Sequence, residues 1–398
     1  MGEEDYKIRD YIRGSLMGGA AGDALGYTVE FMERDRILAR YGEQGITEFE
    51  LDRKGKALVS DDTQMTLFTA NAMLMGLTRG FMRGIGGNPC DYVDKGCIDW
   101  YYTQTGCEND SKIGFTWLKY LPEMAYQRAP GNTCLSACRS MLLHKEVENN
   151  SKGCGGIMRV APMGLLSASY QSKKALHYSV PEVAEAGAKT AMATHLHPLG
   201  FLPAAMMTEL IYKLVPLTPD EAKTQICELA EGTIATLDEI YKDQYLEDRK
   251  YLADLTRKAI RLAQSDVDDS VAIPQLGEGW VAEETWAIAL YCSIKHVDSI
   301  RDAIISAVNH DGDSDSTGSV AGNIMGAIWG YDEIKRQRLF CPEDREFEDT
   351  IELANIILAI ADDISTGCII SEYDFEETPE KLQWFERYCM MKPAGIKR

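Results

Sequence analysis

The sequence predicts an all-α protein that folds as a single compact helical bundle over residues 1–398. Three observations predict it: apolar residues recur with helical spacing, runs of alternating β-branched residues are nearly absent, and no polar linker is long enough to separate two domains. The composition, with 45% hydrophobic and 26% charged residues, is that of an ordinary globular protein. It excludes a disordered chain, a collagen and a disulfide-held miniprotein.

Five segments show the helical pattern most clearly. In the first, Met65, Phe68, Ala72 and Met75 share one face at positions i, i+3, i+7 and i+10. Pro181 suits the first position of the second helix, because the missing N–H costs nothing there. The helices that the pattern predicts span residues 64–77, 181–194, 222–241, 282–295 and 351–364.

Two series of glycines spaced four residues apart lie near the two ends of the chain. Residues at i and i+4 share a helix face, so each series would form a smooth groove that another backbone can approach closely. Each Gly inside a helix costs about 0.8–1 kcal/mol relative to Ala, so packing must compensate; the alternative is that the outer members lie in loops. We expect two central, buried helices, each packed tightly on a neighbour but not necessarily on one another. The series are Gly14, Gly18, Gly22 and Gly26, and Gly318, Gly322, Gly326 and Gly330.

The net charge of −21 and the isoelectric point near 4.8 restrict the partners. A strongly acidic protein repels phosphate backbones, so no nonspecific nucleic-acid binding is expected. The acidic start of the chain is unlike a signal peptide, and no apolar run reaches the length of a membrane span. The 11 cysteines are odd in number and scattered, which favours reduced thiols. We therefore expect a cytoplasmic protein without a membrane partner.

Acidic residues form two clusters, each immediately before a predicted helix. Hard oxygen donors of this kind suit Mg²⁺, Mn²⁺ or Ca²⁺ rather than zinc. Helix capping is the alternative, and it is the better interpretation of the first cluster taken alone. The second cluster holds more carboxylates than a cap requires, and adjacent carboxylates repel and call for a cation. The clusters are Ser60-Asp61-Asp62-Thr63 and Asp311-Gly312-Asp313-Ser314-Asp315-Ser316-Thr317.

Other site types lack their motifs. The second cluster begins like an EF-hand loop, but Ser316 stands where that loop needs Gly and Gly322 where it needs Glu. The sequence also has no dinucleotide-binding G-x-G-x-x-G, no P-loop, no G-x-S-x-G and no H-E-x-x-H. A dehydrogenase, a P-loop NTPase and an α/β-hydrolase therefore lose support.

Five motifs in order resemble the ADP-ribosylglycohydrolase family, whose members include dinitrogenase reductase-activating glycohydrolase and the ADP-ribosylarginine hydrolases. The resemblance covers about residues 10–365 of one domain, with insertions or excursions at about 80–98 and 242–275 and a C-terminal extension at about 366–398. It implies an orthogonal helical bundle with a binuclear Mg²⁺ or Mn²⁺ centre at the base of an ADP-ribose cleft. The motifs are Gly22-Asp23-Ala24-Leu25-Gly26-Tyr27-Thr28-Val29-Glu30-Phe31, Ser60-Asp61-Asp62-Thr63, Gly155-Gly156-Ile157-Met158-Arg159, Thr194-His195 and Gly312-Asp313-Ser314-Asp315-Ser316.

The resemblance also implies roles for the acidic residues. Glu30 matches a mobile Glu near the metals, and Glu30 and Asp62 are the implied catalytic carboxylates. Asp315 would bridge two metal ions. The other implied ligands are Ser60, Asp61 and Asp62 for one metal and Asp313 and Ser316 for the second.

The implied substrate-binding residues lie in the middle of the chain. They are Gly155, Gly156, Met158 and Arg159, which match a loop along the ribose and diphosphate, and His195, which matches a His near the phosphates. Two alternatives stay open: Arg159 could pair with a carboxylate as a structural residue, and His195 could cap the helix before Pro198.

Two departures from the family pattern bear on the chemistry. Cys154 stands where relatives often have a polar residue. Lys112 stands where relatives have an Asp thought to act on the substrate; Asp110 is the nearby substitute, so the general base is left open.

The function that the resemblance implies is hydrolysis at C1″ of a protein-linked ADP-ribose. Among the members of the family, the arginine-specific hydrolases look closest. The similarity lies in the second acidic cluster and in the loop of residues 158–162. A hydrolase for serine-linked or other conjugates is the runner-up, and an inactive ADP-ribose-binding member is a third reading. We expect a monomer that takes an ADP-ribosylated protein as substrate and releases ADP-ribose.

Overall fold

The computed structural model of the chain describes residues 3–84, 87–106, 114–173, 177–371 and 376–396. Helices are the regular structure of these residues, which include no strand and only two isolated β-bridges, Ala57 with Ile351 and Gly153 with Val281. The predicted all-α fold is confirmed. Asp110 and Lys112 lie outside the described residues.

The helices follow one another with short connections. In chain order the α-helices are α1 Glu3–Tyr27, α2 Arg34–Tyr41, α3 Asp61–Arg83, α4 Val93–Thr105, α5 Asn132–Leu142, α6 Ala161–Ser172, α7 Val180–Met192, α8 Pro198–Leu214, α9 Pro219–Ile240, α10 Leu246–Ala263, α11 Asp269–Ala272, α12 Ala282–Lys295, α13 Ile300–Val308, α14 Ser314–Gln337, α15 Phe347–Thr350, α16 Ala354–Thr366 and α17 Pro379–Tyr388. The 3₁₀ turns are η1 Pro89–Tyr92, η2 Trp117–Tyr120, η3 Pro122–Met124, η4 Cys154–Arg159 and η5 Ile273–Gln275.

The five predicted helices correspond to α3, α7, α9, α12 and α16. Eight of the ten boundaries differ from the prediction, by one to six residues, and two of these differences have clear local reasons. Pro181 is the second rather than the first residue of α7, because a capping box between Ser179 and Glu182 starts the helix one residue earlier. Helix α16 begins three residues later than predicted, because Leu353 adopts a left-handed conformation with φ of 62°.

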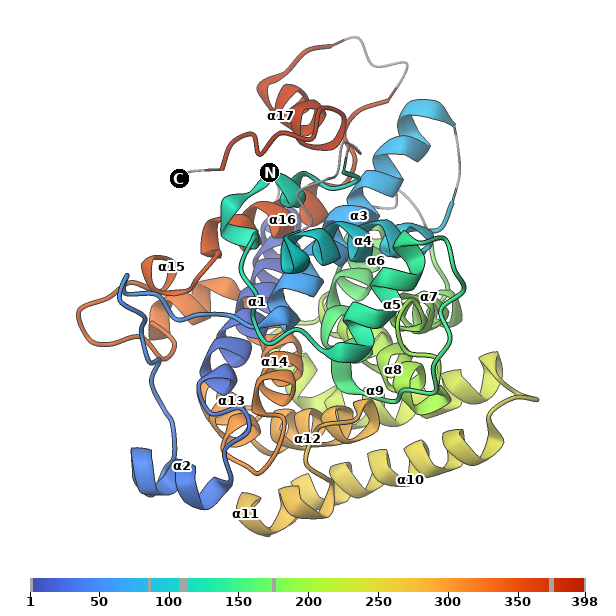
Figure 1. Cartoon of the computed structure of the whole chain (residues 1–398). Coiled ribbons are helices and arrows are strands. Elements are labelled where there is room, and N and C mark those ends of the chain that lie inside the picture. Colours follow the sequence, from blue (N-terminus) through green and yellow to red (C-terminus); the bar gives the residue numbers. More distant parts are fainter. Residues whose placement is uncertain (1–2, 85–86, 107–113, 174–176, 372–375, 397–398) are drawn as a thin grey trace.

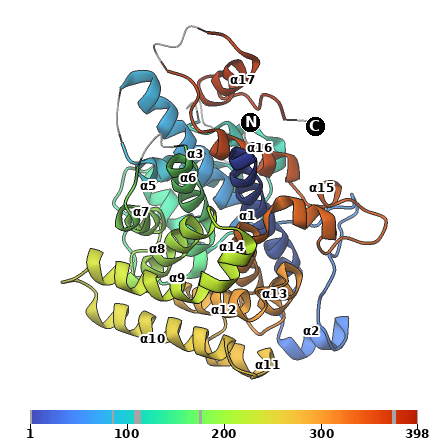
Figure 2. The ribbon, with the colours of Figure 1, turned by 180° about the vertical axis from the view of Figure 1, so that it is seen from behind.

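The two glycine series pack against each other at the centre of the molecule. Helices α1 and α14 run side by side there in both views (Figures 1 and 2). A β-carbon added at Gly18 would lie 2.5 Å from the carbonyl oxygen of Gly322, and one added at Gly322 would overlap the Gly18 carbonyl. Both helices are buried and central, as predicted, and each is the other's close neighbour. Gly330 is the exception in the series: its φ of 76° breaks the helical path of α14.

The remaining helices surround this pair. Helices α3, α12, α13 and α16 contact one or both of its members, and α8, which also contacts α14, packs against α7. Helix α17 lies at one end of the molecule and α10 with α11 at the other (Figures 1 and 2). The segment 242–275, which we expected to be an insertion or excursion, contains α10, and α10 packs on α12. At this contact the indole N–H of Trp286 in α12 donates a hydrogen bond to the hydroxyl of Thr256 in α10 at 3.0 Å.

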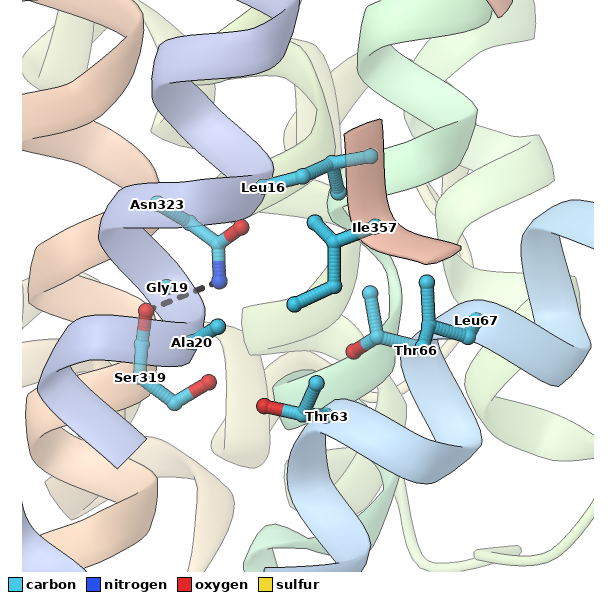
Figure 3. A pocket seen from close by; sticks show the side chains of 9 residues that line it. All are labelled: Leu16, Gly19, Ala20, Thr63, Thr66, Leu67, Ser319, Asn323 and Ile357. Carbon is cyan, nitrogen blue, oxygen red and sulfur yellow. Dashed lines mark hydrogen bonds between the residues drawn. The ribbon is translucent and has the colours of Figure 1, made fainter. Parts of the chain in front are cut away.

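Packing is tight where α1, α3, α14 and α16 meet. A small cavity of about 10 Å³ lies among the residues that Figure 3 labels. The amide of Asn323 turns into it and donates to the carbonyl of Ser319 at 2.8 Å. Thr63, the last residue of the first acidic cluster, also lines this cavity, so the cluster adjoins a closely packed interior.

None of the helices in the described part of the chain combines the length and the apolar character needed to cross a bilayer.

Replacing Gly322 with Ala should destabilise the fold, because the new methyl group meets the backbone of Gly18 rather than a flexible side chain. Overpacking of this kind costs about 1–3 kcal/mol and occasionally more, and we expect the free energy of unfolding to fall by about 3 kcal/mol. Urea unfolding measures it. Gly232→Ala in α9 is the matched control, since only the Lys213 ammonium lies near, at 3.7 Å, and there a gain of about 0.5–1 kcal/mol is expected. Equal stability of Gly322→Ala and the wild type would contradict the close-packing argument.

Candidate metal centre

The first acidic cluster forms the N-terminus of α3. Ser60 is the N-cap residue, and its hydroxyl oxygen accepts a hydrogen bond from the backbone N–H of Asp62 at 3.1 Å. Behind it lies Asp23 of α1, whose carboxylate accepts from the backbone of Ser60 at 2.9 Å and from the backbone and hydroxyl of Thr63. Asp23 therefore fixes the start of α3 to the central helix α1.

The second acidic cluster forms a turn and the N-terminus of α14. Gly312 has φ of 109°, and a β-carbon there would overlap the carbonyl oxygen of Glu278, so this turn requires glycine. The backbone N–H of Asp313 donates to the same carbonyl at 2.8 Å. Thr317 holds the turn from inside, because its hydroxyl bonds to the carbonyl of Asp313 and to the imidazole of His310, both at 2.8 Å.

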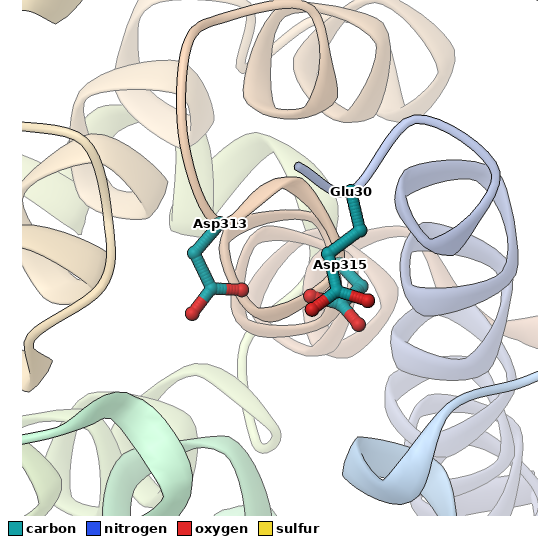
Figure 4. Close-up of side chains that lie close together, drawn as sticks. All are labelled: Glu30, Asp313 and Asp315. Carbon is teal, nitrogen blue, oxygen red and sulfur yellow. The ribbon is translucent and has the colours of Figure 1, made fainter. Parts of the chain in front are cut away.

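The fold brings the two clusters together. The hydroxyl of Ser316 donates to the carboxylate of Asp62 at 3.4 Å, although the two residues are 254 positions apart in the sequence. Glu30, which follows the end of α1, joins them: single carboxylate oxygens of Glu30, Asp313 and Asp315 lie within 4.8 Å of one another. Figure 4 shows the Glu30 and Asp315 carboxylates side by side, with that of Asp313 beside them.

Burial and mutual repulsion govern the electrostatics of this cluster. Burial, then Asp313 and Asp61, raise the pKa of Glu30 to about 8, and burial raises the pKa of Asp61 to about 8. Burial and neighbouring carboxylates hold the pKa values of Asp62 and Asp315 well above the ordinary range. These carboxylates cannot all be ionised at neutral pH without a compensating positive charge.

One buried atom indicates what would supply that charge. The Oδ2 atom of Asp62 is buried and has no hydrogen-bond partner, which is costly for a carboxylate oxygen. Capping accounts for Ser60 and for Asp313, which accepts from the backbone N–H of Ser316, but it leaves this atom unexplained. A hard divalent cation fits the all-oxygen donor set around it.

A sulfur atom adjoins the oxygen donors. The thiol of Cys154 donates a hydrogen bond to the carboxylate of Asp313 at 2.8 Å. Burial, then Asp313 and Asp62, keep the pKa of this thiol well above its usual range, so the group is a neutral thiol beside the carboxylates. The departure from the family pattern at position 154 therefore lies directly against the cluster.

The side chains predicted to bind substrate are mostly turned into the protein. Arg159 is fully buried, and its guanidinium donates to the carbonyl of Thr190 at 3.1 Å and to the hydroxyl of Thr194 at 2.7 Å. Its partners are thus carbonyl and hydroxyl oxygens near the end of α7, and not the carboxylate of the structural alternative. The substrate-binding role of Arg159 stays a prediction.

His195 and the neighbouring loop are also packed inside. His195 is 2% exposed, and burial followed by Arg159 lowers its pKa to about 3, so the ring is neutral and offers a phosphate no positive charge. The α-carbons of Gly155 and Gly156 face other parts of the protein. A β-carbon added at Gly155 would lie 2.7 Å from the sulfur of Cys134, and one added at Gly156 would lie 2.9 Å from the carbonyl oxygen of Gly200. Met158 is 2% exposed. Close packing therefore favours glycine at 155 and 156, and the substrate-binding role of these residues stays a prediction.

Sequence reasoning missed two features of the site. The first is Asp23, which lies in the motif that begins at Gly22 and holds the start of α3. The sequence indicated this role only by a single carboxylate within a helical segment rich in Gly and Ala. The second feature is an exposed aromatic pair, Phe31 and Trp280, whose rings stack beside the cluster. No local pattern pairs these rings, because they are far apart in the sequence.

Comparisons with known proteins bear on the family of the chain. The family model described as ADP-ribosylglycohydrolase matches residues 4–366, which include both acidic clusters. The ADP-ribosyl-[dinitrogen reductase] glycohydrolase of Rhodospirillum rubrum is 23% identical over 334 residues, covering 82% of this chain and 88% of that protein. The human ADP-ribosylhydrolase ARH3 is 24% identical over 216 residues, covering 50% of this chain and 56% of that protein.

A solved structure shows the same fold. The ADP-ribosylglycohydrolase-related protein complex superposes with a TM-score of 0.55 at 18% identity, covering 91% of this chain and 99% of that one. The match of the family model over most of the chain, together with this fold, leads to one conclusion: the chain belongs to the ADP-ribosylglycohydrolase family.

Proposed function

We propose that the protein hydrolyses the glycosidic bond at C1″ between ADP-ribose and a protein side chain, most favourably arginine, in a reaction that depends on divalent metal ions. The observation that carries the proposal is the convergence of two buried acidic helix N-termini with Glu30. Family membership supports the reaction class.

Two Mg²⁺ or Mn²⁺ ions would be held by oxygen donors of the two clusters. The orphaned Oδ2 of Asp62 supports the first site, and the central position of Asp315 among Glu30, Asp313 and Asp62 supports a bridging role. When bound, the ions would supply Lewis-acid charge and a template for the ribose hydroxyls. The proposed ligands are Ser60, Asp61 and Asp62 for one ion and Asp313 and Ser316 for the other, with Asp315 shared.

The protein's own side chains would then stabilise the charge that develops on the ribose and transfer the proton of the attacking water. Positive charge develops on the ribose in glycoside hydrolysis, and the buried carboxylates favour it electrostatically. Glu30 is half-buried at the edge of the cluster and would accept or relay the proton of the attacking water. Asp62, held by Ser316, would orient the reacting groups. The proposed substrate-binding residues are Gly155, Gly156, Met158, Arg159 and His195.

A hydrolysis panel tests the proposal. Purified protein is stripped with EDTA, dialysed and assayed on peptides carrying ADP-ribose on arginine or on serine, with Mg²⁺, with Mn²⁺ and with no metal. We expect turnover of the arginine conjugate with metal, loss of at least about 100-fold without it, and slower turnover of the serine conjugate. Full activity without metal would contradict the metal centre. Tight ADP-ribose binding with no turnover of either conjugate would identify an inactive binding member instead.

A further inference from the structure

A cavity of about 520 Å³ lies near the N-terminal end of the central helix α1. Its walls come from the first turns of α1, the ends of α6 and α8, the connection after α8 and the first half of α9. Tyr11 lines it, whereas Tyr27 ends α1 and leads to Glu30 at the candidate metal centre. With a rise of about 1.5 Å per residue, about 24 Å of helix separates Tyr11 from Tyr27. The cavity is therefore distinct from the candidate metal centre.

The walls of this cavity are mostly apolar. Ile8 of α1, Leu217 of the connection and Leu229 of α9 are among the residues that line it. Leu217 and Leu229 are only partly buried against the core, so each keeps apolar surface that no other side chain covers. A volume of several hundred Å³ with predominantly apolar walls is typical of sites that bind small molecules.

Hydrogen-bond donors accompany the apolar walls. Two lysines, Lys7 and Lys213, and two tyrosines, Tyr11 and Tyr212, line the cavity from α1 and α8. Neither tyrosine hydroxyl has a hydrogen-bond partner among the residues that the structure describes. Burial raises the pKa of both phenols, so both stay protonated as donors. Among the described lining residues, Glu4 is the only one with a negative charge, and it is exposed.

A buried carboxylate holds one of the two lysines in place. Glu209 of α8 is fully buried, and its Oε1 accepts hydrogen bonds from Lys213 at 2.5 Å and from Thr236 at 3.0 Å. An ammonium group has three N–H donors, and this bond uses one of them. Lys7 forms a salt bridge with Glu3 at 3.4 Å, and both side chains are well exposed, so this pair is weak. Both ammonium groups therefore keep donors for a ligand.

This combination of walls and donors selects the head group of a ligand. An ionised carboxylate only accepts hydrogen bonds, and its bonds from ammonium groups are short and strong. A cationic head group would leave the donors unpaired and would be repelled by both lysines. A chain of net charge −21 repels anions in general, so an anion is retained only where positive charge is gathered locally.

We propose that this cavity binds a small amphiphilic carboxylate of the medium-chain fatty acid type. The lysine and tyrosine donors of α1 and α8 hold its carboxylate, and its alkyl chain packs on Leu217 and Leu229. The site goes beyond the proposed function and is independent of it, since none of the described residues that line the cavity belongs to the candidate metal centre.

Calorimetric titration of the full-length protein with decanoate, decanol and decylammonium tests the proposal, because these probes differ in the head group. We expect one decanoate to bind per chain with a Kd of about 10–100 µM. Decanol should bind about fivefold more weakly, and decylammonium at least about tenfold more weakly. Nonspecific adsorption to so acidic a protein would favour decylammonium instead. Saturating ADP-ribose should leave the Kd for decanoate unchanged.

Variants assign the binding to this cavity. Lys7→Met should raise the Kd for decanoate about three- to fivefold. Lys189→Met is the matched control: Lys189 also forms an exposed salt bridge with a Glu four residues earlier, Glu185, but lies on α7 away from the cavity, so the Kd should not change. Leu229→Asp places a negative charge on an apolar wall and should raise the Kd at least about tenfold. Thermal melts report whether this variant folds, and Lys7→Met decides if it does not.

Three results would overturn the proposal. The first is a Kd for decanoate that stays unchanged in the folded variants Lys7→Met and Leu229→Asp. The second is decylammonium binding as tightly as decanoate, which would show general apolar adsorption. The third is displacement of decanoate by ADP-ribose, which would place the carboxylate in the substrate cleft.

Discussion

Asp315→Asn should abolish hydrolysis and metal binding while the protein stays folded. Asp315 is 3% exposed and lies among the carboxylates of Asp313, Asp62 and Glu30, so it is the group through which two ions could be joined. Asn keeps the shape and one oxygen but removes the charge. We expect the rate to fall by about 10³-fold or more, since the loss of a shared ligand disturbs both ions at once.

Thermal melts separate this effect from misfolding. At a metal concentration of 100 times Kd, binding stabilises the wild type by about 2.7 kcal/mol, and the Asn variant should lose that metal-dependent rise in Tm. Without metal, its Tm should equal or exceed that of the wild type, because one buried, repelled carboxylate has been removed. Asp311→Asn is the matched control: it removes a charge from the same turn at an exposed position and should leave rate and melting unchanged. A normal metal-dependent Tm shift in Asp315→Asn would refute the bridging role.

Glu30→Gln should lower kcat by about 10²–10⁴-fold while ADP-ribose binding stays within about threefold of the wild type. Without a bound cation, burial, Asp313 and Asp61 raise the pKa of Glu30 to about 8, so the group holds a proton readily near neutral pH. A nearby divalent cation favours its carboxylate form, which can take a proton from water. Gln has the shape of the protonated Glu side chain, but it can neither give up a proton nor take one from water. The loss is therefore expected in kcat and not in the affinity for ADP-ribose.

The control for Glu30 lies three residues further along. Glu33→Gln changes an exposed carboxylate before α2 that makes no side-chain capping bond, and it should leave kcat unchanged. A kcat of Glu30→Gln close to that of the wild type would exclude Glu30 as the proton acceptor. A loss of ADP-ribose affinity equal to the loss of rate would assign Glu30 to binding instead.

The sequence alone predicted the elements whose pattern is local. Helices α7, α9 and α12 were predicted nearly to their ends, because apolar spacing, caps and prolines act within a few residues. The two acidic clusters were also correctly predicted to start helices, and their charge indicated a cation. The glycine spacing predicted buried, closely packed helices, since only an approaching backbone compensates for so many glycines.

The tertiary structure decided what depends on contacts between distant segments. It paired α1 with α14, placed Asp23 behind Ser60, and turned the Arg159 guanidinium toward the end of α7. A motif states which residues are near one another along the chain, but the direction of a side chain is set by the polar partners that packing brings within reach. The buried Arg159 guanidinium takes the nearest oxygens, and here these belong to the end of α7 and to Thr194 just beyond it. The sequence therefore determined the chemical character of the site, and only the packing of α1, α3 and α14 determined which groups face it.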